Sequence, residues 1–182
     1  ADDTIVIFTS DHGDMFGDHG MMLKGAMHYD GCIRTPLLIN VPDKPAGVCD
    51  SLVGSIDLGP TILALAGTEN FHGMQGHDLT PLLDDPSITP RDSVLIEEEQ
   101  VHDMVHTGRP LRMRTLVTET ARLTIYDGLA HGELFNRTND PDEIHNLYGL
   151  PEAASLQAEL TNQLTREMLS HSDVSPRPTA FA

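Results

Sequence analysis

The sequence predicts an α/β fold in which two buried strands are followed by a small antiparallel sheet and a C-terminal helix. Residues 4–9 and 36–41 are apolar and β-branched without alternation, which is typical of strands covered on both faces of a parallel sheet. Residues 93–98 and about 111–126 have the composition of antiparallel strands. Residues 151–169 carry leucines at four-residue steps, as an amphipathic helix does.

The segment between the two buried strands, residues 10–34, is rich in Gly, Asp, His and Met and has no clean periodicity. We expect a long loop with one short helix, and long structured loops are often functional. A helix is expected to open at Asp57 and to end before Gly67. Asp57 would cap its free N–H groups, and Pro60 is tolerated in its first turn.

The second half of the chain begins after an irregular stretch at residues 70–92 that contains three prolines. The strands predicted there would turn near residues 119–121, and residues 133–136 add a short strand. We therefore divide the chain into residues 1–90, read as part of a catalytic α/β domain, and residues 91–182, read as a small antiparallel-sheet subdomain with its C-terminal helix and a frayed tail from residue 175 onward.

Composition excludes several classes of protein. The formal net charge is −17, with 28 acidic and 11 basic residues, which argues against binding to nucleic acid or to an anionic membrane. No apolar run reaches the length of about 18 residues that a transmembrane helix needs. Cys32 and Cys49 lack metal-ligand spacing and are expected to be free thiols. The sequence does not decide the cellular compartment, although it slightly favours the cytoplasm.

The strongest chemical signal is the run that directly follows the first strand, Thr9-Ser10-Asp11-His12-Gly13-Asp14. Ligands of open α/β sheets bind beyond the carboxyl ends of strands, where a carboxylate and an imidazole can share one cation. Adjacent strand residues point to opposite faces, so this requires the backbone to turn at Asp11, which Gly13 eases. The alternative is a polar loop whose aspartate caps the next element.

Further motifs follow in a fixed order, and together they resemble the sulfatase family of the alkaline-phosphatase-like superfamily. They are Lys24-Gly25, Tyr29-Asp30-Gly31-Cys32-Ile33-Arg34-Thr35-Pro36, the helix from Asp57 to Gly67, and Glu133-Leu134-Phe135-Asn136 followed by Asp140-Pro141-Asp142-Glu143. The resemblance covers residues 4–150. It implies that the chain is the C-terminal portion of a large mixed sheet followed by a small antiparallel sheet and a helix.

By this resemblance, Asp11 and His12 are two ligands of a divalent cation, and Lys24 binds the sulfate or the leaving-group oxygen as the catalytic residue. Calcium is the first expectation, with Mn²⁺, Mg²⁺ or Zn²⁺ as alternatives, because an imidazole suits Mn²⁺ or Zn²⁺ better. The substrate would be a small sulfate ester, or a phosphate ester in the alternative below.

The family's nucleophile motif, C/S-x-P-x-R, does not occur in the sequence. The resemblance places that motif, with its formylglycine, in an N-terminal part that precedes this chain. We therefore expect this chain to carry an incomplete site, to be inactive alone, and to expose apolar surface that favours self-association. A chain that opens on its most buried-looking strand is expected to be a piece of a longer protein.

Two other functions stay open. An Asp–His pair also fits a phosphodiesterase or phosphonate monoester hydrolase of the same superfamily, and the chain could instead be a non-catalytic metal-binding or interaction module. Among the remaining loop residues, His19 and His28 could contact substrate but are more often surface residues. Arg34 is expected to form a structural ion pair, and the four loop methionines are expected to pack beneath the loop.

Overall fold

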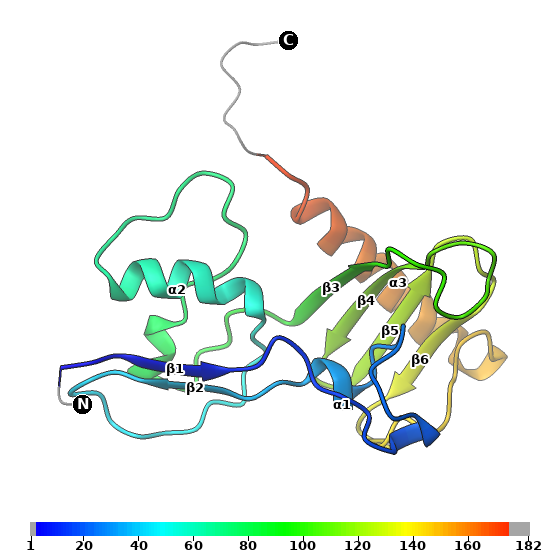
Figure 1. Ribbon diagram of the computed structural model, residues 1–182, viewed down its shortest axis with the longest axis horizontal. Coiled ribbons are helices and arrows are strands. Elements are labelled where there is room, and N and C mark those ends of the chain that lie inside the picture. The colour runs from blue at the N-terminus through cyan, green and yellow to red at the C-terminus, as the bar shows by residue number, and fades with distance from the viewer. Residues whose placement is uncertain (1–2, 175–182) are drawn as a thin grey trace, which may run out of the picture.

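The computed structural model describes residues 3–174 and has two parts joined side by side (Figure 1). The predicted tail from residue 175 lies outside the described residues. One part holds the first two strands and helix α2, and the other holds a four-stranded sheet with helix α3. The predicted mixed α/β class, with its antiparallel sheet and C-terminal helix, is confirmed. Among the described residues, no helix combines the length and the apolar character needed to cross a bilayer.

The first two strands form a separate ribbon. Strand β1 (Val6–Thr9) pairs antiparallel with β2 (Leu37–Asn40), so the predicted parallel arrangement of these strands is wrong. Ile7 lies opposite Ile39 on a half-buried face, whereas Phe8 and Leu38 face each other on the other side and are 60% and 59% exposed. The apolar pattern thus marks strands built for burial, but the described residues cover only one of their faces.

Helix α2 (Leu58–Leu65) follows a 3₁₀ turn at Ser55–Asp57. Asp57 does not cap this helix as predicted, because its side chain makes no hydrogen bond to the helix N–H groups. One carboxylate oxygen accepts the Gly54 N–H, and the other accepts the His77 N–H and the Arg91 guanidinium. The fully buried Asp57 therefore joins three segments that are distant in sequence.

The second part is an antiparallel meander in the order β3 (Ser93–Glu99), β4 (Arg112–Thr118), β5 (Ala121–Tyr126) and β6 (Gly132–Asn136). Helix α3 (Ala154–Ser170) packs against one face of it. That face presents alternate apolar residues of the strands, and these form one core with the helix: Leu116, Leu123, Leu134, Leu160 and Leu164.

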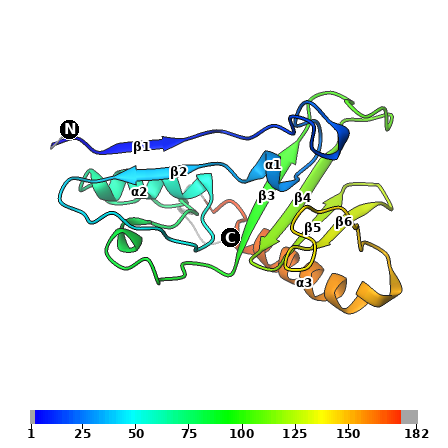
Figure 2. The ribbon, with the colours of Figure 1, turned by 90° about the horizontal axis from the view of Figure 1, so that it is seen from below.

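The opposite face of this sheet is covered by the loop between β1 and β2. Figure 2 shows this loop and the short helix α1 (Asp30–Ile33) on the side of the sheet away from α3. Ala26 of the loop is buried against Met113 and Tyr126 of the sheet. The loop that carries the predicted site residues is therefore a third layer of the second part, and the sheet positions it.

Candidate functional site

Asp11 and His12 come together at the carboxyl end of β1, as the sequence predicts. The Oδ1 atom of Asp11 accepts the backbone N–H of His12 at 3.0 Å, and Ser10 Oγ donates to the His12 carbonyl at 2.7 Å. These bonds fold the backbone back on itself, so that Asp11 Oδ2 lies 3.6 Å from His12 Nε2. The side chains are 86% and 39% exposed, so both donors face the surface of the described residues.

The imidazole of His12 is held in one tautomer by its neighbour. Its Nδ1 lies 2.8 Å from the Gly13 carbonyl oxygen, which can only accept, so Nδ1 carries the proton. The Nε2 lone pair is then free beside the Asp11 carboxylate. The hydrogen bond from the His12 N–H lowers the pKa of Asp11. An ionised carboxylate and an imidazole lone pair are a donor set suited to a divalent cation.

Two donors are fewer than a protein metal site usually supplies. Within residues 3–174, no group of three or more His, Cys, Asp or Glu side chains is arranged to hold a metal ion. Asp14, the nearest further carboxylate in the motif, instead accepts the backbone N–H of Lys24 at 2.8 Å. The two donor atoms are of the kind that a divalent cation binds, but the described residues supply no more than these two.

Lys24 lies at the exposed tip of the loop, and its backbone is held on both sides. The Asp14 carboxylate accepts its N–H, and the thiol of Cys32 points to its carbonyl at 3.8 Å. Its ammonium group makes no hydrogen bond or ion pair with any residue in the described range. The backbone of Lys24 is therefore fixed, while its ammonium group is available to an anionic ligand.

The other sequence candidates have different surroundings from those expected. His28 is not a surface residue but is 3% exposed and bonded to the sheet. His19 stacks on the Tyr29 ring, with ring centroids 3.8 Å apart. Arg34 is exposed and forms no ion pair with a residue that the structure describes, so the expected structural pair is absent there. Cys32 and Cys49 are free thiols, as predicted.

The loop methionines divide between interior and surface. Met15 is 2% exposed, whereas Met22 is 68% exposed beside the exposed Leu23. The expected packing beneath the loop therefore holds for Met15 and not for Met22. A cleft of about 660 Å³ lies elsewhere, lined among others by His72, Arg91 and His171, and contains neither Asp11 nor Lys24.

A buried ionic network beneath the loop was not predicted. Arg122 is fully buried, and its Nε donates to Glu143 Oε1 at 2.6 Å while one terminal nitrogen donates to Glu133 Oε2 at 2.8 Å. The same nitrogen donates to Thr124, and Tyr126 donates to Glu133 at 2.9 Å. The one signal in the sequence was an arginine inside a strand that has no other charged residue.

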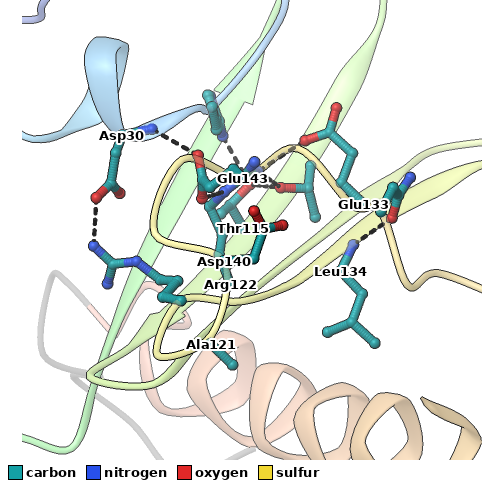
Figure 3. A network of polar contacts seen from close by, with 12 residues as sticks. Asp30, Thr115, Ala121, Arg122, Glu133, Leu134, Asp140 and Glu143 are labelled. Atoms are coloured by element: carbon teal, nitrogen blue, oxygen red, sulfur yellow. Dashed lines mark hydrogen bonds and ion pairs between the residues drawn. The ribbon is translucent and has the colours of Figure 1, made fainter. Parts of the chain in front are cut away.

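This network extends into the loop (Figure 3). The second oxygen of Glu143 accepts the backbone N–H of Asp30 at 2.9 Å, and the Asp30 carboxylate accepts from Arg137 at 2.6 Å. The Arg122 guanidinium lies 5.0 Å from the centroid of the Tyr29 ring. The Asp140–Glu143 turn and helix α1 are thus joined by buried polar contacts, and the turn that the sequence marked as architecture holds the loop.

Comparison with known proteins identifies the family. The family model described as N-sulphoglucosamine sulphohydrolase, C-terminal, matches residues 17–170. The chain belongs to the sulfatase family. Most of the motifs that first indicated this family lie within the matched residues, and the Asp11-His12 pair lies just before them.

Relatives of this sulfatase chain are longer proteins. The uncharacterized sulfatase YidJ of Escherichia coli is 34% identical over 166 residues, which are 90% of this chain and 32% of that protein. An N-acetylglucosamine-6-O-sulfatase of Bacteroides thetaiotaomicron is 30% identical over 178 residues, which are 96% of this chain and 32% of that protein. The chain therefore spans about a third of the length of these relatives.

Solved structures agree with the fold. A phosphonate monoester hydrolase from Silicibacter pomeroyi matches with a TM-score of 0.84 and 27% identity, over 96% of this chain and 37% of that one. A structure in complex with its substrate D-glucosamine-2-N,6-O-disulfate matches with a TM-score of 0.77 and 28% identity, over 98% of this chain and 37% of that one. The same scaffold thus occurs in proteins named for sulfate and for phosphonate substrates.

Proposed function

We propose that this chain is the C-terminal part of a metal-dependent sulfatase that hydrolyses sulfate esters, and that it contributes part of the active site. The observation that carries the proposal is the approach of Asp11 Oδ2 to His12 Nε2 at the end of β1, in a chain of the sulfatase family. Sulfatase relatives that extend well beyond the matched region support the view that other segments complete the site.

Each site residue has a defined task in this proposal. Asp11 and His12 would hold a divalent cation. Such a cation would act as a Lewis acid that polarises the ester oxygens. Lys24 places its ammonium group against the anionic ester and offsets the charge that builds up on the departing oxygen. The nucleophile is expected from a segment outside this chain.

A second candidate is a phosphonate monoester hydrolase or phosphodiesterase. It is favoured by the imidazole at the second ligand position and by the structural match to two phosphonate monoester hydrolases. Both reactions place negative charge on oxygen in the transition state, so Asp11, His12 and Lys24 would keep the same tasks. The two candidates differ in which ester is cleaved faster.

The test uses a longer protein that carries this chain together with an upstream C/S-x-P-x-R motif. We expect aryl sulfate to be hydrolysed with a higher kcat/KM than a phosphonate monoester. Replacing Lys24 by Ala should lower kcat/KM by about 100-fold to 1,000-fold, the range found on removing one charge-stabilising donor. The melting temperature should stay the same, because the Lys24 side chain makes no bond that the structure describes.

The sequence contains one matched control, since Lys44 is its other lysine. Lys44 forms a surface ion pair with Asp84, so Lys44→Ala should leave kcat/KM unchanged. Equal losses of kcat/KM in both variants would show that Lys24 is an ordinary surface lysine. Faster turnover of the phosphonate would favour the second candidate, and no turnover of either ester would leave a non-catalytic module.

A further inference from the structure

His28 joins the loop that carries Lys24 to the sheet. It follows Lys24 by four positions, and its side chain reaches across to two strands. Its Nδ1 lies 2.8 Å from Thr115 Oγ1 on β4, and its Nε2 lies 3.0 Å from Glu98 Oε2 on β3. Both ring nitrogens are therefore used for contacts between the loop and the sheet, which leaves neither for a substrate.

A chain of hydrogen bonds that starts at Arg122 gives every buried hydroxyl proton an acceptor in one direction. A guanidinium only donates, so Thr124 Oγ1 accepts from Arg122 at 2.9 Å. Thr124 can then give its own proton to Thr115 Oγ1 at 2.7 Å, and Thr115 can give its proton to Nδ1 of His28. Nε2–H of His28 completes the chain by donating to the Glu98 carboxylate, so the chain selects the neutral Nε2–H tautomer.

Adding a proton to Nδ1 would break this order. Nδ1–H would have to donate to Thr115, whose hydroxyl would turn to Thr124, and the Thr124 hydroxyl would be left without an acceptor in a buried site. Three charged groups face His28: Glu98 on β3, Arg122 on β5 and Glu133 on β6. Burial lowers the pKa of His28 below its ordinary value of 6.5, although hydrogen bonding to Glu98 acts in the other direction.

We infer that His28 is a positioning residue, which in its neutral Nε2–H form holds the Lys24 loop against the sheet and on protonation releases it. The consequence for catalysis rests on the proposed role of Lys24. Because the closed loop binds the His28 proton less tightly than an open loop does, closure is favoured above pH 6.5. Closure is lost as the pH falls from there toward the lowered pKa of His28.

Amide hydrogen exchange on this chain tests the inference without reference to activity. We compare the exchange of residues 16–27 between about pH 7.5 and about pH 5, corrected for the intrinsic pH dependence of exchange. Uptake of one proton should raise the exchange rate by up to about tenfold for each pH unit below 6.5, until the pKa of the closed form is reached. Nitrogen NMR of the His28 ring should show the Nε2–H tautomer at neutral pH.

Three variants separate positioning from general stability. In His28→Gln an amide can still donate to Glu98 and accept from Thr115 but cannot titrate, so the loop should stay protected and lose its pH dependence. In His28→Ala the loop should exchange fast at both pH values. The exposed His102 provides the control, and His102→Gln should behave as the wild type.

In the longer enzyme, the His28→Gln variant should flatten the acid limb of the kcat/KM profile while keeping activity at neutral pH. Exchange that is independent of pH in the wild type, an Nδ1–H tautomer, or a protected loop in His28→Ala would overturn the inference. If exchange follows the expected pattern but the longer protein cleaves no sulfate ester, the positioning role stands and the proposed function fails. If the longer protein cleaves the sulfate ester but the exchange is independent of pH, the proposed function stands and the positioning role fails.

Discussion

At the scale of single residues, Arg122 is the buried cation on which several polar contacts depend. Its guanidinium bridges Glu133 and Glu143, which are themselves 4% and 2% exposed at the side chain. One of its terminal nitrogens has no hydrogen-bond partner among the described residues, and the ring of Phe135 lies 4.8 Å from the guanidinium carbon. Taking charges out of water is costly, so the two carboxylates depend on this one cation.

We predict that Arg122→Met lowers the free energy of unfolding by about 3–5 kcal/mol, the range found when one partner of a buried ion pair is removed. The control is Arg112→Met, because Arg112 pairs with Glu99 at 3.7 Å on the surface and should contribute less than about 1 kcal/mol. Urea unfolding of both variants measures the difference. Equal, small effects would show that water or another residue can replace the guanidinium.

At the scale of elements, the loop is also held by a close backbone contact between its two ends. The Gly13 N–H donates to the Cys32 carbonyl at 2.7 Å, and a Cβ at Gly13 would lie 2.0 Å from the Gly31 carbonyl oxygen. Gly13 therefore allows the segment after β1 to lie directly against α1. The sequence suggested that this glycine eases a turn at Asp11, whereas the structure shows that close packing requires it.

We predict that Gly13→Ala lowers the free energy of unfolding by about 1–3 kcal/mol, as overpacking does, because the backbone of α1 must shift. Gly47→Ala is the matched control, since its added Cβ meets nothing within 4 Å and should change stability by less than about 0.5 kcal/mol. Thermal unfolding of the two variants compares them. A Gly13→Ala protein as stable as Gly47→Ala would show that the contact is loose.

The sequence predicted those parts of the molecule that local patterns encode. The strands of the meander, helix α3 and the Asp11–His12 turn follow from periodicity and from one short motif. His28 could not be placed in this way, because its partners Glu98 and Thr115 are 70 and 87 residues distant and meet it only in the folded chain. The role of Glu143 likewise depends on a positive φ of 53° and on the register of β5 with β6.

The exposed β1–β2 ribbon shows a second limit of sequence patterns. Apolar strands indicate that burial is required, but they do not say which segment provides it. The sequence therefore predicted two covered strands of a parallel sheet, and the structure has an antiparallel pair with Phe8 and Leu38 on an exposed face. The pairing direction also depends on how the long intervening loop returns, which no local pattern determines.

At the scale of the whole molecule, the site and its support belong to different parts. Asp11 and His12 extend from the ribbon, while the loop that follows them is held by the meander. Both side chains face the surface, and within residues 3–174 no further His, Cys, Asp or Glu joins them in a group that could hold a metal ion. A cation bound to this chain would therefore keep most of its coordination shell as water.

We predict that this chain alone binds Ca²⁺, Mn²⁺ or Zn²⁺ with a Kd weaker than about 1 μM and hydrolyses no aryl sulfate. Calcium takes about 6–8 oxygen ligands and zinc three or four protein ligands, whereas the pair supplies two. Calorimetric titration with each metal and an aryl-sulfate assay on the same sample give the answer. Submicromolar affinity, or turnover that Asp11→Ala abolishes, would show that the site is complete in this chain.

One ionic network joins the loop to the meander through Asp30, Arg137, Glu143 and Arg122. It therefore limits where the sequence of this chain can be joined to the sequence of a relative in a chimeric protein. A chimera whose crossover lies between residues 35 and 92 would join a loop from one parent to a meander from another and so separate the bonding partners. A crossover before residue 10 would transfer Asp11, His12, the loop and its supporting sheet together. Libraries of hybrid enzymes built at the earlier boundary should therefore retain more folded members.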